Sequence, residues 1–205
     1  MTVRRKNSIV TFVLALSATL MVGCTQIERP AEPATSPSPV ATNPRDLAIN
    51  LADLPEGWRV DNTTTRAISS PKELSGDSSD DSSFRTNGWS SAYEADFIGG
   101  TNGAEEILVL IQQFKNPSGA RTFFASGIGS QKGQHGSSMS SPPILGQDSN
   151  VFIRQISGKS QTQFWFYWVD QNILVRVLLA GPDGFMSEST AVKIVERQAA
   201  IIRAT

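Results

Sequence analysis

Apolar and polar residues alternate with a period of two over residues 93–97, the pattern of a strand with one buried face. Five consecutive apolar residues follow at 107–111 and indicate a central strand covered on both faces. Three more strands are expected at 151–157, 163–169 and 173–179, and their short connections predict antiparallel neighbours. Because the central strand is apolar on both faces, helices must lie on both sides of the sheet.

Two helices are predicted from caps and apolar spacing. Asn116 and Pro117 form an N-cap and first-turn signature, and we expect Gly127 and Gly129 to end the helix that follows. Residues 186–204 are amphipathic and should pack on the sheet as a closing helix. Strands in hairpins with helices between and after them predict an α+β fold, an antiparallel sheet flanked by helices as an α/β/α sandwich.

The region before this sheet is less regular. Leucines at helix-like spacing over residues 47–54 predict a short first helix, and a first strand is expected to begin at Trp58. Residues 61–91 are rich in Ser, Thr and Asp, so we expect them to form a mobile excursion from the domain.

Residues 1–23 have the order of a secretory signal peptide. Arg4, Arg5 and Lys6 precede a run of 16 residues without charge, Ser8 to Gly23. As a helix this run would reach about 24 Å, short of the roughly 30 Å hydrocarbon core of a bilayer. Export by the general secretory route is therefore favoured over a spanning anchor.

Cys24, the single cysteine of the chain, follows directly after this segment. The run Leu-Met-Val-Gly before it resembles the lipobox at which bacterial lipoproteins are cleaved and acylated, although Met21 stands where Leu is usual. A lone cysteine has no intramolecular disulfide partner, which favours lipidation at Cys24. The alternatives are a soluble secreted protein with an accidental cysteine and an uncleaved signal anchor.

Five prolines among Ala, Ser and Thr fall within residues 29–44, a composition that stays extended. We therefore assign residues 24–45 to a Pro-rich tether and residues 46–205 to a single domain. At about 3.1 Å per residue, some 20 residues of tether would hold the domain up to ~60 Å from the bilayer. The alternative is a pro-segment that packs on the domain.

Composition removes several classes of function. The chain has 205 residues, 39% of them hydrophobic, and 18 basic against 19 acidic residues give a net charge of −1. No basic cluster indicates a nucleic-acid partner. The single histidine, His135, lies in a Gly/Ser-rich loop that would hold a catalytic base poorly, so a hydrolase ranks last. Asp77, Asp80 and Asp81 lack the spacing of an EF-hand and are expected in a hydrated loop rather than around calcium. No metal, cofactor or catalytic residue is expected.

The most informative motif is a run of five aromatic residues at 164–168. A strand sends the second and fourth of them, Trp165 and Tyr167, to the face opposite the other three. Either helices cover both sets, or one face is incompletely covered. In the second case Trp165 and Tyr167, with Trp89, would form an amphipathic patch for an apolar ligand or a partner protein.

Four segments in this order carry a resemblance to known proteins: Asp-Leu-Pro-Glu-Gly-Trp at 53–58, the strand at 88–97, Leu-Gly-Gln-Asp at 145–148, and the closing helix. In this arrangement the chain resembles small exported bacterial lipoproteins with a PsbP-like α/β/α sandwich, and extracellular sensor domains of some bacterial receptor kinases. The resemblance implies the sandwich fold and no functional residue, since the fold serves accessory proteins, carriers and sensors alike. Such kinase sensor domains commonly have paired cysteines, which this chain lacks.

We therefore expect a lipid-anchored protein at the cell membrane or outer membrane, with its domain outside the cytoplasm. Its expected role is non-catalytic, as a binding or accessory module for another envelope component. A carrier for a small apolar molecule is the alternative.

Overall fold

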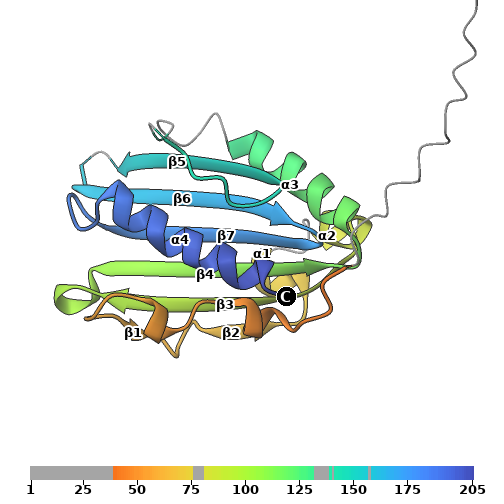
Figure 1. Ribbon diagram of the computed structural model, residues 1–205, viewed down its shortest axis with the longest axis horizontal. Helices are drawn as coiled ribbons and strands as arrows, with labels where there is room; N and C mark the ends of the chain where they lie inside the picture. Colours follow the sequence, from red (N-terminus) through yellow and green to blue (C-terminus); the bar gives the residue numbers. More distant parts are fainter. Residues whose placement is uncertain (1–38, 76–80, 132–138, 140, 157) are drawn as a thin grey trace, which may run out of the picture. The chain divides into compact units, whose positions relative to one another are not determined.

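An antiparallel sheet forms the centre of the structure (Figure 1). The computed structural model describes residues 39–75, 81–131, 139, 141–156 and 158–205. Among these residues seven strands form one sheet in the order β1-β3-β4-β7-β6-β5, and β2 also pairs with β3. The strands are β1 (Arg59–Val60), β2 (Arg66–Ile68), β3 (Trp89–Gly99), β4 (Glu105–Phe114), β5 (Asp148–Ile156), β6 (Gln161–Asp170) and β7 (Ile173–Pro182).

Helices cover both faces of this sheet, as the apolar central strand predicts. We name the two sides the α4 face and the α3 face after the long helix on each. The first carries α4 with the short 3₁₀ helices η1 and η2, and the second carries α1, α2 and α3. The predicted α+β fold, an antiparallel sheet flanked by helices, is confirmed. The bounds are η1 (Pro44–Leu47), η2 (Leu51–Asp53), α1 (Pro71–Ser75), α2 (Asp81–Thr86), η3 (Thr101–Gly103), α3 (Pro117–Gln131) and α4 (Glu188–Arg203).

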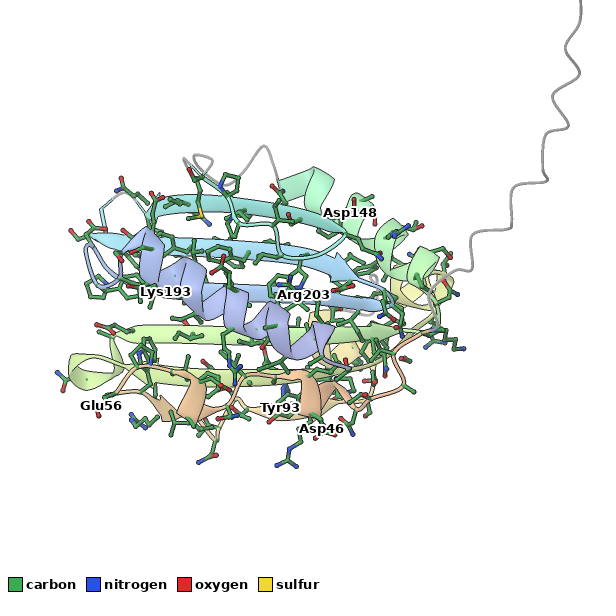
Figure 2. All side chains as sticks on the ribbon, viewed as in Figure 1. Asp46, Glu56, Tyr93, Asp148, Lys193 and Arg203 are labelled. Atoms are coloured by element: carbon green, nitrogen blue, oxygen red, sulfur yellow. The ribbon has the colours of Figure 1, made fainter. Side chains whose placement is uncertain are left out.

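Separate cores lie on the two faces. On the α4 face, Phe166 and Trp168 of β6 pack with Val195 of α4 in the largest cluster, and all three side chains are fully buried. Charged side chains such as Lys193 lie on the solvent side of α4 (Figure 2). On the α3 face, a second cluster joins Leu110 and Phe114 of β4 to helices α2 and α3.

Three local predictions are wrong. The polar region 61–91 contains β2, α1 and α2, because the isolated apolar side chains of Ile68 and Phe84 are buried against the sheet. Helix α3 does not end at Gly127 or Gly129 but continues to Gln131. The predicted first helix is also split, because Asn50 caps η2 through the Ala52 N–H and interrupts the leucine pattern.

The domain begins earlier than the predicted boundary at residue 46. The compact unit is Pro37–Thr205, and Val40 and Pro44, placed in the tether above, are buried. Two buried amide side chains hold this first segment. Asn172 accepts from the Val40 N–H at 2.6 Å, and Gln198 of α4 accepts from the Ile49 N–H at 2.8 Å.

Candidate binding site

The aromatic run in β6 is divided between the two faces as predicted for a strand. Phe164, Phe166 and Trp168 lie in the core under α4 and are at most 3% exposed. Trp165 and Tyr167 point to the α3 face, where Tyr167 is 5% exposed and Trp165 is half-buried. Three residues of the run therefore fill the core under α4. Of the two on the other face, Tyr167 is buried and Trp165 is half-buried.

Trp165 and Tyr167 join Phe152 of β5 in what we call the aromatic stack. The Trp165 and Tyr167 rings lie 6.0 Å apart with an interplanar angle of 8°, and Phe152 stacks on Tyr167 at 5.7 Å. The Trp165 indole Nε1 donates to Gln163 Oε1 at 3.2 Å. Phe124 of α3 packs against the stack from one side. The rings are thus held nearly parallel, and Trp165 is the one of the three that is only half-buried.

Trp89 does not belong to this stack. It is 8% exposed and packs in the other α3-face cluster, edge-on to Phe84 at 6.0 Å. The structure therefore brings together two of the three aromatic residues that we proposed as a patch, and places the third under α2.

Arg176 of β7 lies beside the aromatic stack on the same face, and nothing in the sequence patterns above singled it out. It is paired with Tyr167 on one side and with Leu110 on the other. Its Nε is buried and has no hydrogen-bond partner, and no ion pair of Arg176 is found among the described residues. A buried donor without a partner costs about 1–3 kcal/mol. A lone arginine within the apolar segment 173–180 was the available signal.

Acidic side chains lie on the same face, on the other side of the sheet. Asp96 of β3 and Glu106 of β4 both point to the α3 face. Burial raises the pKa of Asp96, against a hydrogen bond from Thr64 and with help from the charges of Asp61 and Glu94. Burial also raises the pKa of Glu106, and the neighbouring carboxylates, Asp96 first, add to the shift. The face therefore has an acidic side on β3 and β4 and a cationic, aromatic side on β5 to β7.

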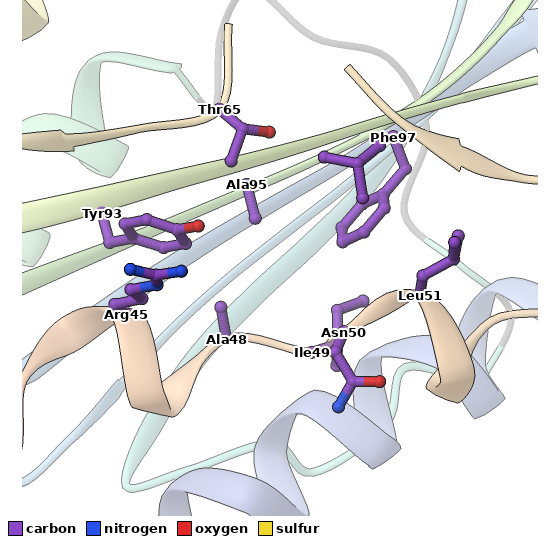
Figure 3. A pocket seen from close by; sticks show the side chains of 10 residues that line it. Arg45, Ala48, Ile49, Asn50, Leu51, Thr65, Tyr93, Ala95 and Phe97 are labelled. Carbon is purple, nitrogen blue, oxygen red and sulfur yellow. The ribbon is translucent and has the colours of Figure 1, made fainter. Parts of the chain in front are cut away.

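A separate pocket of about 210 Å³ lies on the α4 face, between the first segment and β3 (Figure 3). Ala95 and Phe97 of β3 form part of its apolar floor, while Arg45 and Tyr93 lie together at one end. The volume is below the roughly 300–1,000 Å³ of common ligand pockets. It would accept a small molecule or one end of a larger one.

Other candidate residues add no further site. Cys24, His135, Asp77 and Asp80 lie outside the described residues, and Asp81 begins α2. Within the described ranges, no group of three His, Cys, Asp or Glu side chains is arranged to hold a metal ion. No helix in those same ranges is long and apolar enough to cross a membrane.

Comparisons with known proteins support the fold and not a specific function. No protein-family model matches the chain, and no curated protein matches it significantly. Among solved structures, the chain is similar to the extracellular domain of PknH from Mycobacterium tuberculosis, with a TM-score of 0.55 and 16% identity. The alignment covers 82% of this chain and 99% of that domain. At this level of identity the comparison shows a shared fold, and that fold occurs in a domain that lies outside the cell.

Proposed function

We propose that this protein is an exported lipoprotein, acylated at Cys24, whose domain is a non-catalytic binding module for another component of the cell envelope. The signal-like residues 1–23 and the lone cysteine after them support the export and the anchor. The fold shared with an extracellular domain is consistent with this location. The resemblance to PsbP-like lipoproteins supports the same role, because that group includes small accessory proteins.

The anchor is tested by a Cys24→Ala variant in a detergent-partition assay. The wild-type chain should enter the detergent phase because acyl chains add about 0.8 kcal/mol per buried CH₂. The variant cannot be acylated at this position, so after removal of its signal peptide it should remain in the aqueous phase. A variant that partitions like the wild type would refute acylation at Cys24.

The observation that carries the binding role is Trp165, the one ring of the aromatic stack that is half-buried rather than buried. An indole ring held by parallel neighbours supplies contact area at little entropic cost, which suits recognition. Tyr167 and Phe152 are already buried, so they would support the ring rather than make most of the contact.

A Trp165→Ala variant tests this role, with Trp168→Ala as its matched control in the same strand. Trp168 is fully buried, so its removal should destabilise the domain by about 3–5 kcal/mol. Removal of Trp165 should cost much less stability but abolish binding of a neutral aromatic probe, 2-naphthalenemethanol. Equal losses of stability with unchanged probe binding would assign Trp165 to packing alone.

The second candidate, a carrier for a small apolar molecule, is favoured by the pocket beside η1. Native mass spectrometry of the purified protein should then reveal a co-purified ligand of low mass. An Ala48→Phe variant would fill the wall of this pocket and should release that ligand, while Trp165→Ala should retain it. The two candidates therefore predict opposite responses to the two variants.

A further inference from the structure

Arg176 is half-buried, and its Nε is buried without a hydrogen-bond partner. Its strand neighbours on the same face are Leu174 and Leu178, and its cross-strand neighbours are Tyr167 and Leu110. Four apolar or aromatic side chains thus surround the guanidinium stem. The buried Nε has no acceptor, and the buried Oε1 of Gln112, a diagonal neighbour on β4, has no donor either.

The acids on this face do not supply the missing partner. Glu106 lies on β4, beside β7, but it is paired with Ala180, four residues along the strand from Arg176. Glu94 is bound to Arg66 at 3.2 Å, and Asp96 accepts from the Thr64 hydroxyl at 2.7 Å. Both lie on β3, two strands away from β7 in the sheet order. An anion would therefore be repelled by the β3–β4 side of the face and attracted to the side of Arg176.

The aromatic stack lies next to this cation. Tyr167 is directly opposite Arg176, and Trp165 is the diagonal neighbour, since it pairs with Leu178. Diagonal residues on adjacent antiparallel strands are about 7–8 Å apart, a distance that one fused-ring molecule can span. A guanidinium and a half-buried indole at this spacing match a ligand with an anionic group at one end and a flat apolar body.

We infer that the aromatic stack and Arg176 form one binding site for a small organic anion, a carboxylate or phosphate attached to an aromatic or other flat apolar group. This inference rests on the proposed binding role of Trp165 and specifies its ligand. Arg176 donates charge-assisted hydrogen bonds to the anion through the terminal nitrogens of its guanidinium group. Trp165 covers the flat part of the ligand.

The test is isothermal titration of the full chain in nanodiscs of zwitterionic lipid, with empty discs as the blank. The probes are 2-naphthoate, 1-naphthyl phosphate and the neutral 2-naphthalenemethanol, so the two anions distinguish a carboxylate from a phosphate ligand. At least one anion should bind more tightly than the neutral probe, and its affinity should fall as salt is added.

Arg176→Met should weaken binding of that anion by about tenfold or more and leave the neutral probe unchanged. Arg176→Lys should retain part of the preference because it keeps the charge without the planar fork. Lys193→Met removes a positive charge from the solvent side of α4 and should change neither affinity. A thermal melt of each variant confirms that it is folded.

The outcomes separate this inference from the proposed function. Anion affinity that stays within twofold in Arg176→Met overturns the inference, as does failure of both anions to bind the wild type. If Trp165→Ala weakens every probe in that case, the binding role of Trp165 stands without an anion subsite. If Trp165→Ala changes no probe, the proposed function fails as well.

Discussion

The side chain of Gln198 should determine whether the first segment of the domain stays in place. It is fully buried in α4, its Oε1 accepts from the Ile49 N–H at 2.8 Å, and its Nε2 donates to the Leu47 carbonyl at 2.6 Å. Leu47 and Ile49 are themselves buried, so neither backbone group has water as a substitute. A Gln198→Leu variant keeps a similar volume but removes both hydrogen bonds.

Each orphaned buried group costs about 2 kcal/mol, within the usual range of 1–3 kcal/mol, so we expect a loss of about 4 kcal/mol in the free energy of unfolding. For a domain of this size that corresponds to a fall of roughly 8–16 °C in Tm. Differential scanning calorimetry measures the change, and Glu196→Gln, an exposed position on the same helix, is the control.

Hydrogen exchange locates the effect within the structure. The Ile49 amide should be protected in the wild type and exchange much faster in Gln198→Leu, while the amides of β4 and β7 remain slow in native conditions. A Tm within about 2 °C of the wild type, together with unchanged protection at Ile49, would refute the role of Gln198 in holding this segment.

Three further changes follow from other features. Burial raises the pKa of Asp96 above its ordinary 3.8, so the stability it contributes is full below that pH and is lost as the pH rises through the folded-state pKa. Asp96→Asn should therefore unfold at a higher urea concentration than the wild type at pH 7, and a difference that does not shrink toward pH 4 would contradict this. Arg176→Met should raise the Tm of the ligand-free protein by roughly 2–4 °C, because about 1 kcal/mol of unsatisfied burial is removed; a lower Tm would show that the arginine stabilises the fold. Gly119→Ala should destabilise the domain by about 1–3 kcal/mol in calorimetry, because a Cβ there would lie 2.0 Å from the Asn87 carbonyl oxygen. Helix propensity alone predicts the opposite sign, a gain of up to about 1 kcal/mol.

Most of the sheet could be predicted because its strands carry strong periodic patterns. The apolar run 107–111 lies in β4 near the centre of the sheet, and the three later strands pair as antiparallel neighbours. The region 61–91 could not be predicted in the same way. Its buried residues Ile68 and Phe84 are isolated among polar residues, so only tertiary packing makes them part of a core.

The candidate site was partly predictable for a related reason. The alternation of β6 placed Trp165 and Tyr167 on one face, but nothing local in the sequence indicated that Trp89 would pack under α2 instead. Alternation also suggested that Asp96 faces solvent, whereas Thr64 and Thr65 hydrogen-bond to it and bury it. Such contacts join segments that are far apart in the sequence, so short local patterns do not predict them.

The hydrogen bonds of Asn172 and Gln198 also constrain when the domain can fold. They join positions 132 to 151 residues apart, from the first residues of the compact unit to the β6–β7 turn and the last helix. A ribosome must release nearly the whole chain before these bonds can close. Under the proposed export through a secretory pore, this late closure would keep the newly made chain unfolded until it has crossed the membrane.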